Sequence, residues 1–358
     1  MFYLGLIVST CYIPGITGVS IPTQWAVLSA ILPHTLWRTA TLGPAFYLGL
    51  TVLAFASLST LWAPSHYDSG YGLWLACIWF LAFRLGATTA DLSAFFRGLA
   101  IGLAISSMVA ILQWFAVPLP ILAPYGLYPS GLFYNSTLLG ASAALVILGL
   151  IEDLYIEYIP LALPALILSQ SRGAWLALTT ALAIRWFHPL LAAIGTLAIA
   201  TTFLIFLDTS NAERLTIWGV ALRELSIFGF GIGSFNSIYY TIPGPQWVHP
   251  EFAHNDYLQL WFELGIMAIP IYLVLALALT QRHAALIGFI ILSCFYFPLW
   301  CPVPALIGCI LTGRGVRDWR RARAACDHRG PNLLPRPSHP RSIVHPDWRQ
   351  AIPSLPPA

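Results

Sequence analysis

A histidine followed by two polar residues opens one of the long apolar runs of the chain. His254 and Asn255 directly precede the stretch 256–280, which begins with Asp256 and is otherwise apolar enough and long enough for a membrane helix. Asp256 and Gln259 have the spacing of a capping box, with Asp256 as the N-cap. A neutral imidazole just outside such a helix could accept a proton from an incoming hydroxyl near neutral pH. The alternative is a structural histidine that hydrogen-bonds to loop backbone.

Arg172 lies between two apolar runs, in the stretch Ser171-Arg172-Gly173. A guanidinium at membrane depth is retained only if it is paired or functional. Its planar fork of donors suits bidentate phosphate binding better than an ammonium group does. The alternative is a side chain that snorkels to water, because the position is close to an interface.

Arg214 and Arg223 lie in a polar stretch between two apolar runs. Apolar residues at 217, 220, 221 and 225 predict an amphipathic helix on the membrane surface. Both arginines are candidates for binding a diphosphate. Surface ion pairs with Glu213 and Glu224 are the alternative, and Arg223, which adjoins Glu224, is the weaker candidate.

Two further patterns do not predict a cofactor. Gly229, Gly231 and Gly233 form a GxGxG run, but no βαβ unit surrounds it, so we predict a flexible turn rather than a dinucleotide site. The stretch 249–256 holds His249, His254 and two carboxylates, but it lacks HExxH spacing and contains Pro250. We therefore expect no metal and no other cofactor.

The elements that must position these residues are membrane helices. Of the 358 residues, 58% are hydrophobic and only 9% are charged, against about 25% charged in soluble domains. The composition predicts an all-α polytopic membrane protein of about 12 transmembrane helices with one large, partly helical periplasmic loop. The predicted spans are 2–14, 21–37, 42–63, 71–86, 94–116, 136–151, 154–169, 171–187, 189–207, 256–280, 283–298 and 299–313.

The arginine distribution orients these spans. Residues 314–358 hold nine Arg and three Asp, so the positive-inside rule places the C-terminus in the cytoplasm. Counting back, Arg172, Arg214, Arg223 and His254 fall on the outer side, where topology requires no cation. We predict four parts: helices one to nine in 1–207, the large periplasmic loop in 208–255, helices ten to twelve in 256–313, and a disordered cytoplasmic tail in 314–358.

Four stretches together resemble the bacterial O-antigen ligase and polymerase superfamily, which includes lipopolysaccharide O-antigen ligases and protein O-oligosaccharyltransferases. They are the Gly-x-Phe-x-Asn segment 131–135, the Ser-Arg-Gly segment 171–173, the large loop from Arg214 to Phe235, and His254-Asn255 followed by nine residues and Gly265. The chain departs from the ligase motif at Ala268, where the family usually has Gly, Thr or Tyr. That departure leaves the subtype open between ligase, polymerase and protein transferase.

The resemblance implies a glycosyltransferase that takes a glycan from undecaprenyl diphosphate. His254 would be the general base, Arg172, Arg214 and Arg223 would bind the diphosphate, and Asn255 and Asp256 would orient the substrate. The acceptor would be lipid A-core, a polysaccharide or a protein, at the periplasmic face of the bacterial inner membrane. Membrane lipid would be a partner, and nucleic acid would not.

Other classes of function remain open on the sequence. A transporter of lipid-linked glycans would use the same arginines as a passing anion site, but such proteins tend to show internal repeats, which are not found here. A non-catalytic scaffold would leave the outer arginines unexplained.

Overall fold

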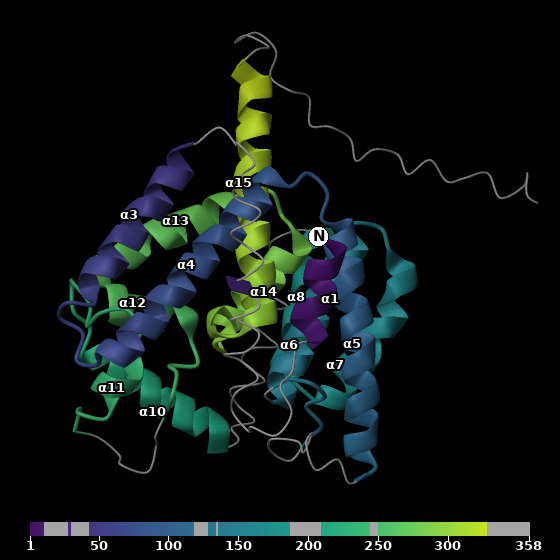
Figure 1. The fold of residues 1–358 in the computed structure, drawn as a ribbon, viewed down its shortest axis with the longest axis horizontal. Helices are drawn as coiled ribbons and strands as arrows, with labels where there is room; N and C mark the ends of the chain where they lie inside the picture. Colours follow the sequence, from purple (N-terminus) through teal and green to yellow (C-terminus); the bar gives the residue numbers. More distant parts are fainter. Residues whose placement is uncertain are drawn as a thin grey trace, which may run out of the picture. The chain divides into compact units, whose positions relative to one another are not determined.

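The computed structural model describes residues 1–10, 28–29, 43–117, 128–133, 135–186, 209–243 and 250–327. The chain divides into two compact units, Met1–Trp319 and Arg320–Ala358, and the candidate site residues lie in the first. In the described part of the chain every regular element is a helix (Figure 1). The predicted all-α class is therefore confirmed.

The described elements follow one another in this order: α1 Phe2–Thr10, α3 Pro44–Ser59, α4 His66–Thr88, α5 Ser93–Trp114, α6 Ser136–Glu152, η2 Ile156–Tyr158, α7 Ile159–Ser169, α8 Arg172–Trp186, α10 Thr209–Arg223, α11 Phe235–Tyr239, α12 Asp256–Leu264, η3 Gly265–Met267, α13 Ala268–Leu279, α14 Ala284–Ser293, η4 Pro298–Trp300 and α15 Pro302–Asp327. The large loop is partly helical, as predicted, because α10 and α11 lie within it.

Three helical stretches of the described residues are long and apolar enough to cross a membrane. They are His66–Thr88, Ser93–Trp114 and Asp256–Leu279, and four shorter apolar helices accompany them. The predicted count of twelve spans is not confirmed. The predicted span 189–207 lies outside the described residues, as does all of 21–37 except residues 28–29.

The predicted span 256–280 is not one continuous helix. It breaks at Gly265, whose φ of +55° lies in the left-handed region that favours glycine. A Cβ at this position would lie 2.0 Å from the Ile227 carbonyl oxygen. The break therefore leaves room for a segment of the large loop to pack against the end of α12.

The predicted tail begins later than residue 314. The helix α15 continues from Pro302 to Asp327, whereas we expected disorder from 314. The reason is that the first basic residues of the tail have acidic partners: Arg314 Nη1 lies 3.2 Å from Asp153 Oδ1, and Arg317 Nη2 lies 2.8 Å from Asp318 Oδ1. Residues 328–358 lie outside the described residues.

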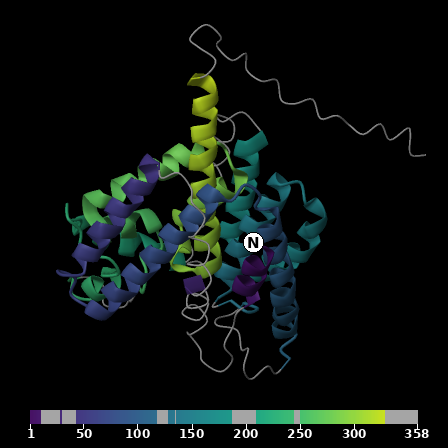
Figure 2. The same cartoon turned by 45° about the horizontal axis from the view of Figure 1, so that its top comes forward.

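Within the first unit, α6 is enclosed along most of its length. Every residue from Leu138 to Leu150 is buried, which is expected of a helix that is apolar on all sides. Asn135 caps its start, where the side-chain oxygen accepts a hydrogen bond from the Leu138 amide at 2.9 Å. The helices α7, α8 and α14 pack around α6, while α3 packs against α4 and α13 (Figure 2).

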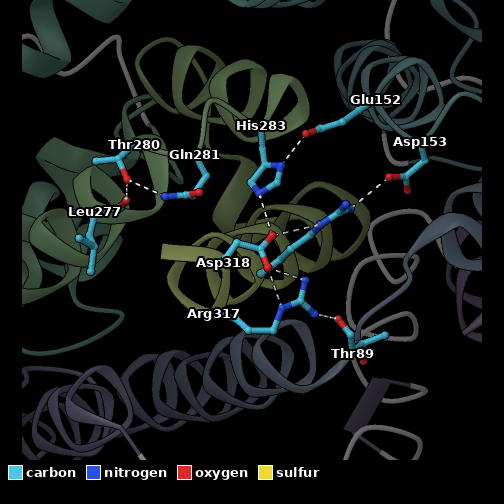
Figure 3. A network of polar contacts seen from close by, with 10 residues as sticks. Thr89, Glu152, Asp153, Leu277, Thr280, Gln281, His283, Arg317 and Asp318 are labelled. Atoms are coloured by element: carbon cyan, nitrogen blue, oxygen red, sulfur yellow. Dashed lines mark hydrogen bonds and ion pairs between the residues drawn. The ribbon is translucent and has the colours of Figure 1, made fainter. Parts of the chain in front are cut away.

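The ends of these helices form two separate polar regions. One region joins the C-terminal end of α6 to the start of α14 and to α15: His283 Nδ1 lies 2.5 Å from Glu152 Oε1, and His283 Nε2 lies 3.6 Å from Asp318 Oδ2 (Figure 3). Arg317 also donates to the Thr89 carbonyl at the end of α4. The second polar region lies at the opposite ends of α4, α6 and α14, next to the sequence motifs described above.

Candidate functional site

The N-cap of α12 is Asn255, not Asp256 as predicted. Asn255 has extended backbone, and its side-chain oxygen accepts a hydrogen bond from the Leu258 amide at 3.0 Å. Gln259, expected to close a capping box, instead accepts from the Ala253 amide at 3.0 Å. The register is shifted by one residue because asparagine is an equally good cap and Asp256 has a different partner.

Asp256 is buried and faces the turn that follows α14. Its Oδ2 accepts a hydrogen bond from the Leu299 amide at 3.0 Å. The contacts of Asn255 and Asp256 are thus with backbone: Asn255 holds the start of α12, and Asp256 holds residues 296–300 against that start. They can orient His254 through the position of the loop.

The residue before His254 is fixed on both sides. The Ala253 amide donates to Gln259 Oε1, and the Ala253 carbonyl accepts from Trp218 Nε1 of α10 at 2.8 Å. His254 itself has a φ of +53°, a conformation that is uncommon for residues other than glycine and is often found at functional sites. The histidine is therefore held in a defined backbone geometry between α10 and α12.

Tyr296 and Phe297 bring three of the motifs together. The guanidinium of Arg214 lies over the Tyr296 ring, 5.1 Å from its centroid, and a Cβ on Gly173 would lie 2.2 Å from the same ring. The His254 ring meets Phe297 edge to face, with 5.0 Å between centroids. Two adjacent aromatic side chains thus contact the large loop, the Ser-Arg-Gly turn and the His-Asn motif.

The environment of His254 favours a neutral imidazole. Burial, and secondly the positive charge of Arg214, lower the pKa of His254 to about 4. Its Nδ1 is buried and has no hydrogen-bond partner among the described residues. This environment therefore favours an uncharged imidazole at neutral pH, with one ring nitrogen that makes no hydrogen bond within the described residues.

Arg172 is the first residue of α8 and its side chain is exposed. Ser171 precedes it and accepts a hydrogen bond from the Ala174 amide at 3.3 Å. The same turn packs on α6, because a Cβ on Gly140 would lie 2.4 Å from Ser169 Oγ and 2.7 Å from Ser171 Cβ. The Ser-Arg-Gly segment thus packs on α6, the helix that follows the Gly-x-Phe-x-Asn segment, and Arg172 adjoins the glycine that packs on Tyr296.

Arg223 lies apart from these residues. At 100° per residue, nine positions of a helix carry Arg223 to the face of α10 opposite to Arg214, and its side chain is exposed. The apolar stripe of α10 is confirmed at Ile217, Val220 and Ala221, which pack against Phe235 and Phe262 of the protein, whereas Leu225 is exposed.

The glycine run forms a turn, as predicted, but one that is closely tied to α12. All three glycines have positive φ. Glu263, which is fully buried, accepts from the Gly233 amide at 2.7 Å and from Gln259 Nε2 at 3.0 Å. A chain of hydrogen bonds therefore connects the glycine run, through Glu263 and Gln259, to Ala253, the residue before His254.

Sequence reasoning overlooked Tyr296, Phe297, Trp218 and Glu263. Glu263 carried a usable signal, because a carboxylate inside an apolar span usually has a specific partner. Tyr296 and Phe297 carried little signal, because an aromatic pair before a proline is equally typical of a membrane interface.

The described residues contain no group of three or more His, Cys, Asp or Glu side chains that could hold a metal ion. His249 lies outside the described residues. Arg214 contacts the Tyr296 ring, and Arg172 adjoins the glycine that packs on that ring, so both arginines are candidates for contact with an anionic ligand.

The comparisons with known proteins agree with this region of the chain. Residues 159–273 match the family model Wzy_C, O-antigen ligase. The match covers about a third of the 358 residues, and it includes α8, α10 and α12. No curated protein matches the sequence.

The match supports a ligase-type, glycosyltransferase-like function in the broad sense and, with the apolar helices, a membrane protein. It confirms the resemblance of the chain to the O-antigen ligase superfamily over the segment that holds Arg172, Arg214 and His254.

Proposed function

We propose that the chain transfers a glycan from undecaprenyl diphosphate to an acceptor hydroxyl, such as that of lipid A-core, at the periplasmic face of the inner membrane. The observation that most supports this is the placement of Arg214 and the Ser-Arg-Gly turn on the Tyr296 ring, beside the His254–Phe297 contact. This arrangement offers a cation to a leaving diphosphate and a neutral base to an attacking hydroxyl within one small region.

In the proposed reaction, the acceptor oxygen attacks the anomeric carbon of the glycan. A ring nitrogen of His254 takes the hydroxyl proton, and the bond between the anomeric carbon and the diphosphate oxygen breaks. Undecaprenyl diphosphate leaves with the electron pair of that bond. Attack from the side opposite to the leaving group inverts the configuration at the anomeric carbon.

Arg214 and Arg172 would stabilise the charge that develops on the diphosphate. Arg214 is held over Tyr296 and is close enough to His254 to disfavour its protonation. Burial and, to a smaller extent, this repulsion favour the neutral base before the anion arrives. We leave Arg223 out of the proposed diphosphate site because it lies on the opposite face of α10.

An apolar cavity next to Asp256 could take part of the prenyl chain. Its volume is about 150 Å³, and its lining comes from α3, α4, α12, α13, α14 and α15, including Trp79, Phe80 and Phe83. Because almost all of the lining is apolar, a hydrocarbon chain suits it better than a sugar does. The cavity would place such a chain on the far side of α12 from α10.

The test is transfer of a labelled glycan from undecaprenyl diphosphate in proteoliposomes, with lipid A-core, polysaccharide or protein as acceptor and EDTA present. We expect product from the wild type with one of these acceptors and far less product from His254→Ala. The acceptor that is used separates the ligase from the polymerase and the protein oligosaccharyltransferase. Movement of intact donor between leaflets without covalent change would instead identify a transporter.

A further inference from the structure

Three segments that are far apart in the sequence meet where α3 ends and α13 begins. They are 57–63, 225–232 and 265–269. The Ile266 amide donates to the Ile227 carbonyl at 2.8 Å, and the Ile232 amide donates to Ser59 Oγ at 3.0 Å. Gly231, with a φ of +101°, packs so closely that a Cβ there would lie 2.7 Å from Ala63 Cβ. These contacts fix the three segments relative to one another.

The side chains that point outward from this junction are large and apolar. Phe228 is 67% exposed and Leu61 is 76% exposed, and the three segments contain no charged residue. We call this surface the apolar rim, and it consists of Leu61, Trp62, Ile227, Phe228 and Ile266. Contiguous exposed apolar surface of this kind marks a contact with a partner or a membrane.

The position of the apolar rim identifies that partner as lipid. On one side the rim continues into exposed apolar residues of α3, and on the other into those of α13: Tyr47, Leu50, Leu58, Ile269 and Leu273. Exposed polar residues, Glu224 and His66, adjoin two of the three segments. The rim nevertheless continues along the apolar helices α3 and α13, whereas a protein-binding patch is surrounded by a polar border. An exposed tryptophan at such an edge is typical of the bilayer interface.

The loop between Ser226 and Gly233 can enter the bilayer because the backbone amides from Gly229 to Gly233 all have partners within the protein. The Phe230 amide donates to the Phe262 carbonyl at 3.0 Å, and the Gly231 amide donates to the Glu263 carbonyl at 2.9 Å. Irregular backbone is tolerated at membrane depth only when its polar groups are satisfied by protein. Here the broken end of α12 supplies these partners.

We propose that the apolar rim inserts among the lipid acyl chains on the side of the membrane where His254 lies. The glycine run of the large loop is then a membrane anchor rather than part of a water-exposed loop. Because Glu263 and Gln259 join the glycine run to Ala253, the anchored loop also determines the height of His254 above the bilayer. This membrane contact does not depend on the reaction proposed above.

The first test uses the full-length protein in liposomes that contain a phospholipid with a diazirine in its acyl chain. After photolysis and digestion, mass spectrometry should find lipid adducts on the peptide that holds Ile227 and Phe228. Tyr240 is a matched control, because it is exposed and lies in the same predicted loop but outside the apolar rim. Adducts on Tyr240 but not on Phe228 would overturn the proposal.

The second test compares Phe228→Cys with Tyr240→Cys in the same liposomes. A membrane-impermeant maleimide should label Tyr240→Cys readily and lose most of its reaction with Phe228→Cys, after the signal of the native cysteines is subtracted. Equal labelling of the two variants would show that the rim is in water. A disulfide between two copies of Phe228→Cys without lipid adducts would show a second copy of the chain on the rim, and would also overturn the proposal.

Discussion

Two histidines of this chain precede helices, and their surroundings are opposite. His283 caps α14 and has a carboxylate near each ring nitrogen, Glu152 at 2.5 Å and Asp318 at 3.6 Å (Figure 3). His254 lies two residues before α12, beside Phe297 and close to Arg214. Among the described residues it has no ion pair with a carboxylate.

The difference shows how the same side chain serves two purposes. Carboxylates on both sides of His283 join α6, α14 and α15, so this region holds the helices together. Burial and a neighbouring cation keep the His254 imidazole neutral, which is the state a general base requires. A histidine with acidic partners is thus a structural element here, and a histidine beside an arginine is the candidate base.

The largest expected effect is on the rate of glycan transfer, and it distinguishes His254 from His283. His254→Ala should lower glycan transfer about 10²–10⁴-fold, which is the usual contribution of a general base, and should leave thermal stability nearly unchanged. Transfer rates in proteoliposomes and thermal unfolding in detergent measure the two quantities. A His254→Ala variant that transfers glycan at the wild-type rate would refute the role of His254.

The next effect compares two arginines of one helix. Arg214→Gln should lower transfer about 10²–10³-fold, as the loss of one transition-state donor does. Arg223→Gln should leave the rate unchanged, because Arg223 lies on the opposite face of α10. The same transfer assay measures both variants, and equal losses would mean that the arginines act through the surface charge of α10.

His283→Ala should instead affect stability. It leaves the Glu152 carboxylate without its closest partner in a nearly buried position, so we expect a loss of about 1–3 kcal/mol in unfolding free energy. Denaturant unfolding of the purified protein measures the change. A large loss of transfer rate with unchanged stability would contradict the assigned structural role.

The smallest effect concerns pH. Because the pKa of His254 is lowered from 6.5 to about 4, kcat/KM should stay level from neutral pH downward and fall only as pH approaches 4. In Arg214→Gln the second cause of the shift is removed, so this fall should begin at higher pH. Transfer rates measured across pH 4 to 8 test both expectations.

The lowered pKa of His254 also predicts how the stability of the folded state changes with pH. Between pH 6.5 and about 4 the unfolded chain binds a proton at His254 that the folded chain does not. This group therefore destabilises the folded state progressively as pH falls through that window, and its penalty is constant below about 4. An acid limb of kcat/KM near pH 6.5 would show instead that the environment of His254 is not the one described.

Much of the site could be predicted from types and spacing. The helical stripe of α10 followed from period 3.6, and the place of His254 before a helix followed from the polar triplet at 254–256. The predicted N-cap of α12 was wrong by one residue. Asn255 and Asp256 are both good caps, and only the contact between Asp256 and Leu299 decides between them. The break in the helix at Gly265 was not predicted, because a glycine within an apolar stretch does not by itself indicate that the helix ends there.

The sequence by itself determined what depends on local composition: an all-α chain, helices apolar enough for a membrane, and the motifs that resemble O-antigen ligases. The tertiary structure decided what depends on contacts between distant segments. Only packing brings Gly173 and Arg214 to one ring at Tyr296 and gives His254 its lowered pKa. Local periodicity fixes the direction of a side chain around its own helix, but the neighbours that it meets are set by the long-range packing of helices.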